Sequence, residues 1–140
     1  MTREQIVAFF VRRQHAWARH DAAALAADHA ENCVAESPWA GTMKGREAIE
    51  QAYRHWFTAF PDFAFEGEEL LIDGHRVARM ATGVGTDIGG FMGLSPTGRP
   101  FRFPVVFLYT LNERQIVHER RIYDFTGMLV QIGMLRAKPA

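Results

Sequence analysis

The chain has 140 residues, 48% of them hydrophobic, which is enough for one domain with a sizeable core. Its 16 basic and 16 acidic residues balance, and no basic stripe is long enough for a nucleic-acid interface or an anionic membrane surface. The single cysteine, Cys33, cannot form an internal disulfide, and no apolar run approaches the ~20 residues of a membrane helix or the core of a signal peptide. We therefore expect one cytoplasmic domain, residues 1–140, that binds neither nucleic acid nor membranes.

The chain opens with helical periodicity. Thr2 followed by Gln5 has the form of a capping box, and Ile6 and Phe9 then begin an apolar series at helical spacing. This pattern predicts an amphipathic helix that ends near Arg19.

Two more helices are expected before the strands begin. Asp21 is a suitable N-cap for an alanine-rich helix, while Gly45 and Pro61 are suitable boundaries for a third helix. The elements expected here are a helix at 22–31, a short strand at 33–37 and a helix at 45–60.

Beyond Pro61 the apolar period changes from that of a helix to that of a strand. Gly67 is a suitable bulge site, and Asp73-Gly74 is a strong hairpin signal. The glycine- and proline-rich segment 87–100 is expected to be a loop. The expected strands are 63–72, 76–86, 101–111 and 115–124, followed by an amphipathic segment at 125–135.

Helices followed by hairpin-connected strands indicate an α+β fold with the helices on one face of a curved antiparallel sheet. A sheet of this length twists and can curl into a half-open cone. The first and third helices would then cover its concave side. The space between them and the sheet is the expected place for a deep ligand pocket.

Motifs for metals, cofactors and nucleophiles fail on spacing or context. Gly83, Gly85 and Gly89 lack the glycine spacing and the following helix of a dinucleotide site. His118-Glu119 is not part of an H-E-x-x-H motif, and a lone cysteine offers no metal-binding pair. No G-x-S-x-G elbow is present. We expect no metal and no cofactor.

The last expected strand carries charged side chains on both faces. Alternation places His118, Arg120, Ile122 and Asp124 on one face and Glu119, Arg121 and Tyr123 on the other. If the first face looks into the cone, it supplies the pocket with an imidazole, a guanidinium and a carboxylate. Charged strand faces are usually solvated, so alternation alone leaves both orientations open.

Large apolar side chains near the expected concave side are candidates for lining the pocket. Residues of these types also occur in ordinary core packing, and that alternative stays open. The candidates are Trp17, Trp39, Trp56, Phe60, Met80, Phe91, Val106 and Ile122.

Several segments together carry a family resemblance. They are GREAI at 45–49, FPDF at 60–63, GTDIGGFMG at 85–93, PTGR at 96–99, and IVHE at 116–119 continuing to Asp124 and QIG at 131–133. These segments resemble the third helix, glycine-rich loop and closing strand of the SnoaL-like polyketide cyclases. The resemblance implies a cone-shaped nuclear transport factor 2-like fold and a homodimer. It also implies that Asp124 is the acid/base of an intramolecular aldol ring closure that needs no metal or cofactor, and it favours the inward orientation of the Asp124 face.

The chain departs from the family pattern in three places. Asp87 stands where the family has a histidine, Gly90 stands where it often has an acidic residue, and the strand 101–111 contains no histidine. The catalytic candidates are therefore Asp124 with His118 or Arg120 as its helper, acting on an apolar polyketide-like or ester substrate. Three alternatives stay open: a non-catalytic binding module of the same fold, a ketosteroid-isomerase-like enzyme and an epoxide-hydrolase-like enzyme.

Two expectations concern surfaces. The loop 89–100 should fold over the pocket mouth when a ligand is bound. The outer face of the sheet should form the dimer interface, with Glu119 and Arg121 pairing across a twofold axis.

Overall fold

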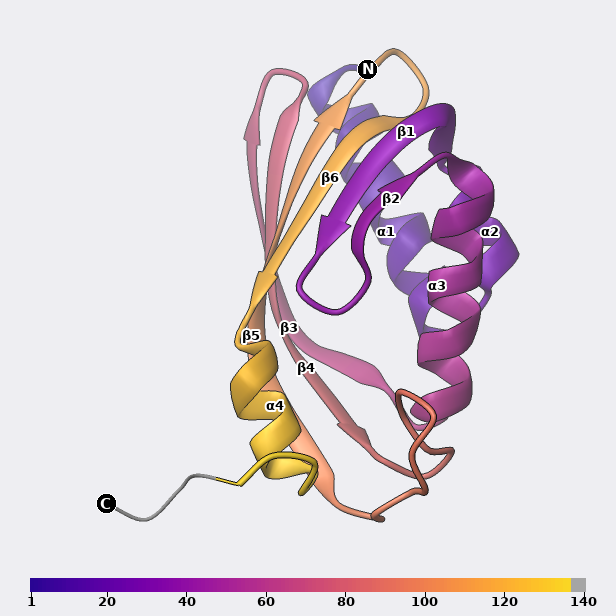
Figure 1. Ribbon diagram of the computed structural model, residues 1–140. Helices are drawn as coiled ribbons and strands as arrows, with labels where there is room; N and C mark the ends of the chain where they lie inside the picture. Colours follow the sequence, from indigo (N-terminus) through magenta and orange to yellow (C-terminus); the bar gives the residue numbers. More distant parts are fainter. Residues whose placement is uncertain (137–140) are drawn as a thin grey trace.

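The computed structural model describes residues 1–136, which form a six-stranded curved sheet with helices on one face (Figure 1). The helices are α1 (Arg3–Ala18), α2 (Ala22–Ala27), α3 (Arg46–Ala59) and α4 (Phe125–Gln131). The strands are β1 (His29–Ser37), β2 (Gly41–Lys44), β3 (Ala64–Asp73), β4 (Arg76–Thr86), β5 (Pro100–Leu111) and β6 (Ile116–Tyr123). The expected α+β architecture is confirmed.

The strands lie in the order β2-β1-β6-β5-β4-β3. All neighbours are antiparallel except β1 and β6, which run parallel. The helices α1, α2 and α3 cover one face of the sheet, and α4 continues from β6 beside β5 (Figure 1). No helix within residues 1–136 combines the length and apolar character needed to cross a bilayer.

Local signals explain most element boundaries. The capping box at Thr2 is formed: its Oγ1 accepts from the Gln5 N–H at 3.1 Å, and the Gln5 Oε1 accepts from the Thr2 N–H at 2.8 Å. The second helix ends at Ala27 rather than at residue 31, because Asp28 is held by two arginines of α1 and the chain enters β1 directly afterwards. The hairpin strand β2 was not expected from the sequence.

Glycines in β3 and β4 shape the sheet for aromatic packing. Gly67, with φ +65°, lies where the β3–β4 register shifts, as expected of a bulge. A Cβ atom at Gly83 would lie 3.0 Å from Phe103 Cζ, and one at Gly85 would lie 2.7 Å from Phe101 Cζ. These two glycines therefore leave room for the rings of Phe103 and Phe101, which pack directly against them.

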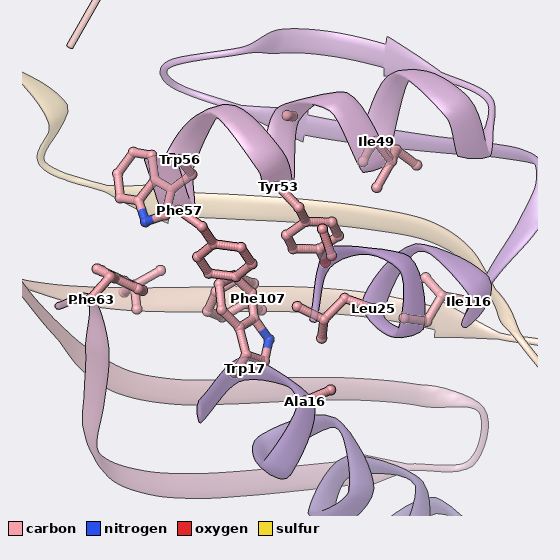
Figure 2. Packing of buried hydrophobic residues seen from close by; sticks show 14 of the residues in the cluster. Ala16, Trp17, Leu25, Ile49, Tyr53, Trp56, Phe57, Phe63, Phe107 and Ile116 are labelled. Atoms are coloured by element: carbon pink, nitrogen blue, oxygen red, sulfur yellow. The ribbon is translucent and has the colours of Figure 1, made fainter. Parts of the chain in front are cut away.

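The core is a layer of aromatic rings between the helices and β5. Figure 2 shows Trp17 of α1 meeting Phe57 of α3 and Phe107 of β5; the ring centroids are 5.6 Å and 6.2 Å away. Phe107 is 2% exposed and Trp17 is 7% exposed. Burial of this kind stabilises a fold by about 1.5–3 kcal/mol per large apolar side chain, and it is what chiefly holds the helices to the sheet.

The loop between β4 and β5 closes one end of this interior. Asp87 anchors it, because its Oδ2 accepts from both the N–H and the hydroxyl of Thr97, at 3.0 Å and 3.1 Å. Phe91 is buried with its ring 4.9 Å from that of Phe60, whereas Met92 and Leu94 are each 56% exposed. Whether this loop responds to a ligand stays a prediction.

Candidate functional site

The register of β6 against β5 decides which face of β6 looks inward. Glu119, Arg121 and Tyr123 lie opposite Tyr109, Phe107 and Val105, which are 2–3% exposed beneath the helices. His118, Arg120 and Ile122 are paired with Thr110, Leu108 and Val106 on the outer face, and Ile122 is 46% exposed. The prediction that the Asp124 face looks into the interior is wrong. The aromatic row of β5 requires burial, and strand pairing places its β6 neighbours on the same side.

A small cavity of about 30 Å³ lies between α1, α3 and the inner face of the sheet. Space of this size holds about one or two water molecules. Most of its lining is aromatic. The lining residues are Trp17, Ser37, Trp39, Tyr53, Trp56, Phe63, Phe65, Phe103, Val105, Phe107, Arg121 and Tyr123.

Arg121 is the charged residue of this lining. Its Nε donates to Glu119 Oε2 at 2.7 Å, and its guanidinium carbon lies 5.1 Å from the centre of the Tyr53 ring and 5.7 Å from that of Phe107. The side chain is 13% exposed, and its Nη2 is buried without a hydrogen-bond partner among residues 1–136. Burial opposes the charge, but the Glu119 carboxylate outweighs it, so the pKa of Arg121 lies above its ordinary value.

Further hydrogen-bond donors belong to the same lining. The indole Nε1 of Trp56 is buried and has no acceptor within the described part of the chain. Burial raises the pKa of Tyr123 to about 12, so its hydroxyl stays protonated at neutral pH. Among residues 1–136, the lining includes no carboxylate and no imidazole, so the cavity offers donors and aromatic faces to a ligand.

A buried polar network lies behind the cavity, where α1, α2 and α3 meet β1. Arg13 donates to Asp28 at 2.9 Å and to the Tyr53 hydroxyl at 3.0 Å. His29 lies with Nε2 3.3 Å from that hydroxyl and Nδ1 3.4 Å from Cys33 Sγ. Because buried polar groups are costly unless they are paired, this network fixes the position of Tyr53 in the cavity wall.

The pKa values of the buried groups in and beside this network show which of them can react. Burial lowers the pKa of His29 to about 3, so the imidazole is neutral. Burial raises the pKa of the Cys33 thiol to about 12, which makes it a poor nucleophile. Burial alone would raise the pKa of Glu119, but Arg121 outweighs it and the pKa is lowered, so this carboxylate is ionised. Residues 1–136 contain no group of three side chains suited to hold a metal ion.

The three residues predicted to be catalytic lie outside this cavity. Asp124 is exposed and is the N-cap of α4, where its Oδ1 accepts from the Gly127 N–H at 2.8 Å. His118 pairs with Glu36 at 3.1 Å on the outer face, and both side chains are nearly half exposed. Arg120 is exposed on the same face.

The predicted pocket residues divide into three groups. Trp17, Trp39 and Trp56 line the cavity, and their contact with a ligand stays a prediction. Phe60 and Phe91 are buried next to Trp56, with ring centroids 4.8 Å and 5.8 Å from it, but they are not part of the lining. Met80, Val106 and Ile122 were predicted wrongly, because they are cross-strand partners in one row on the outer face.

Sequence reasoning missed the polar residues of the cavity, namely Ser37, Tyr53, Arg121 and Tyr123. One signal for two of them was available. The strand 101–111 has a row of aromatic residues at alternate positions, and a strand paired with it must turn one of its own faces to the same side. Choosing that face required the register, which the sequence does not contain.

The sequence profile of the SnoaL-like polyketide cyclases matches residues 9–132. The chain belongs to this family. No protein with a curated description matches it in sequence.

Solved structures agree with the fold of this SnoaL-like chain. AclR from Streptomyces galilaeus superposes with a TM-score of 0.83 at 22% identity, covering 99% of this chain and 87% of that one. TsrD from Streptomyces laurentii gives 0.83 at 18% identity, with coverages of 96% and 99%. A protein of ketosteroid isomerase-like fold from Catenulispora acidiphila gives 0.75 at 22% identity and covers 95% of each chain. These likenesses confirm the cone-shaped nuclear transport factor 2-like fold.

Proposed function

We propose that this SnoaL-like protein is a small-molecule enzyme of the cyclase or isomerase type, in which Arg121 polarises a carbonyl oxygen of an apolar, planar substrate. The observation that carries the proposal is a cavity lined by aromatic faces and hydrogen-bond donors. Within that lining, Arg121 Nη2 and Trp56 Nε1 are buried without acceptors among residues 1–136. A ligand oxygen would supply the acceptor that both donors lack.

Such donors favour reactions through an enolate. When a proton leaves the carbon next to a carbonyl group, negative charge develops on the oxygen, and a fixed guanidinium stabilises that charge most strongly in a site that excludes water. The hydrogen bond from Arg121 to Glu119 holds the guanidinium in place before a substrate arrives. Ring closure by aldol addition and double-bond isomerisation both pass through such an enolate.

A second candidate is a non-catalytic binding module of the same fold. It is favoured by the lack of a carboxylate or an imidazole among the described residues of the lining, because a general base normally lies within hydrogen-bond reach of the proton that it takes. Under the enzymatic proposal, the proton passes through a water molecule admitted with the substrate to Glu119, which is ionised and whose Oε1 has no hydrogen-bond partner among residues 1–136.

The size of the cavity means that a substrate must displace side chains on entry. A benzene-sized ligand needs a cavity of about 150 Å³, several times the space beside Arg121. Phe91 is a candidate for displacement, because its loop carries glycine hinges and exposed neighbours. A cytoplasmic location is also part of the proposal, consistent with a single, unpaired and buried cysteine.

The test uses 2-tetralone, an apolar ketone fused to an aromatic ring and with activated α-protons, in deuterated buffer. Catalysed exchange of these protons, followed by proton NMR, should occur with the wild-type chain. It should fall by roughly 10²-fold or more in Arg121→Met, the typical loss for one oxyanion donor. Arg120→Met, on the outer face, is the matched control and should exchange at the wild-type rate.

Removing Arg121 alone leaves Glu119 buried without a partner, which can cost ~3–5 kcal/mol. The double variant Glu119→Gln/Arg121→Met avoids that penalty and should show the same loss. Exchange at the wild-type rate in both folded variants would contradict the role of Arg121. Binding of 2-tetralone that depends on Arg121 without exchange would favour the binding module.

A further inference from the structure

A second hollow of about 240 Å³ lies between α1 and β3, next to the cavity but separate from it. Its walls come from the end of α1 and from the bulged start of β3. They are Gln14, Trp17, Ala18, Phe63, Ala64, Phe65, Gly67, Glu68 and Arg79. Its volume exceeds the roughly 150 Å³ that accommodates benzene in an apolar cavity, so an aromatic ring fits without rearrangement.

Arg79 gives this hollow a buried cation. Its side chain is 3% exposed, and its guanidinium carbon lies 4.3 Å from the centre of the Phe65 ring. Glu68 pairs with Nε at 3.2 Å and with Nη2 at 3.3 Å. Nη1 is buried and has no partner among residues 1–136. Because Glu68 would repel an anion here, the missing acceptor is better supplied by an uncharged carbonyl oxygen than by a carboxylate.

The hollow and the cavity share a wall. Trp17, Phe63 and Phe65 line both spaces, and Phe65 is the least buried of the three. The guanidinium carbons of Arg79 and Arg121 lie 5.2 Å and 5.7 Å from the centre of the same Phe107 ring. The two guanidinium carbons are therefore at most about 11 Å apart, so a two-ring aromatic molecule with a carbonyl group at each end is long enough to contact both. Figure 2 shows Trp17 next to Phe107, with Phe63 to one side of them.

We propose that the hollow is a second subsite of the ligand site, which takes a carbonyl-bearing aromatic end of an elongated ligand against Arg79. The other end lies beside Arg121, so this inference rests on the proposed function. Movement of Phe65 joins the two spaces. The ligand class is a neutral, planar aromatic molecule with acceptor oxygens at both ends.

The experiment compares 2-acetylnaphthalene with 2,6-diacetylnaphthalene, whose second carbonyl lies at the far end of the same ring system. Binding is measured by quenching of tryptophan fluorescence. The diketone should bind the wild-type chain at least about tenfold more tightly, the scale of one added hydrogen bond to a charged donor. This advantage should disappear in Glu68→Gln/Arg79→Met, which removes both charges together. The matched control is Glu50→Gln/Arg54→Met, which removes an exposed pair of α3 and should keep the advantage.

A second variant fills the hollow without touching its buried pair. Ala18 is exposed at the rim and lies on the same face of α1 as Gln14, so Ala18→Trp should fold and should also abolish the advantage of the diketone; Ala23→Trp, exposed on α2, is its control. Equal affinity of the two ketones for the wild-type chain would overturn the second subsite. An advantage that survives in both hollow variants would overturn it as well. The 2-tetralone exchange experiment decides the role of Arg121 separately, so the two failures are distinguishable.

Discussion

At the scale of single residues, the interior of this protein is notable for the charge that it buries. Glu119 is 0% exposed and Arg13 is 1% exposed, beneath a layer of aromatic rings. Replacing a buried ion pair with apolar residues often leaves a protein as stable or more stable. We therefore interpret the pair of Glu119 and Arg121 as a device that fixes the guanidinium at the cavity, and the pair of Arg13 and Asp28 as one that fixes Tyr53.

His29 provides a stability prediction from the same network. Its pKa is lowered to about 3 in the folded chain, chiefly by burial, whereas an unperturbed histidine titrates near pH 6.5. The neutral imidazole therefore stabilises the fold fully above pH 6.5, and this contribution is lost as the pH falls toward 3, because the unfolded chain takes up the proton. Between pH 6.5 and pH 5 the loss should be about 2 kcal/mol.

The measurement is urea unfolding of the wild-type chain and of His29→Gln at pH 7 and pH 5. The difference in free energy of unfolding between the wild type and His29→Gln should be smaller at pH 5 than at pH 7 by about 2 kcal/mol. His55→Gln, at an exposed position of α3, should show no such change. Parallel curves for the wild type and His29→Gln would mean that folding leaves the pKa of His29 unchanged.

At the scale of elements, Asp124 has a structural role as the N-cap of α4. Its side chain accepts the Gly127 N–H and so satisfies one of the unpaired donors of the first helical turn. Asp124→Ala should cost about 1 kcal/mol in urea unfolding, the usual value of an N-cap, and should leave the exchange of 2-tetralone protons unchanged. Thr126→Ala, at an exposed position of the same turn, is the control and should cost less. A folded Asp124→Ala chain that loses exchange would restore the acid/base role implied by the family resemblance.

The elements with strong local signals were predictable. The capping box set the start of α1, and the Asp73-Gly74 turn set β4 at the residues expected. The end of α2 was not predictable, because it depends on ion pairs between Asp28 and distant residues of α1. The strand β2 is only four residues long and owes its existence to pairing with β1.

The prediction of the site residues also succeeded where it depended on local sequence and failed where it depended on distant residues. Trp17 and Trp56 of the cavity were found from residue type and helical face, and Trp39 was found from residue type alone. The inward face of β6 was not, because alternation gives two faces and only the partner strand selects one. Because the wrong face was chosen, His118, Arg120 and Asp124 were predicted to face the pocket. The residues of β6 that face inward are Glu119, Arg121 and Tyr123. It also placed Glu119 and Arg121 in the expected dimer interface, where the structure does not put them.

At the scale of the whole molecule, α1, α2 and α3 cover one face of the sheet and leave the other face uncovered by them (Figure 1). The uncovered face presents an apolar row across β4, β5 and β6, formed by Met80, Val106 and Ile122 in register. Ile122 is 46% exposed, and Leu71 of β3 is 55% exposed. An apolar sheet face of this kind is typical of a protein interface.

We propose that two copies of the chain pair through this face, as the family resemblance implies. Light scattering at micromolar concentration should give twice the 15.9 kDa of one chain. A stable contact should bury more than ~1,000 Å² in total.

A twofold interface uses the same patch on both copies, so one substitution places two charges in it. Ile122→Glu should therefore yield a folded monomer, whereas Ile88→Glu, equally exposed on the loop between β4 and β5, should remain a dimer. A wild-type mass of one chain would contradict the interface, and a dimer that tolerates Ile122→Glu would place it elsewhere on the surface.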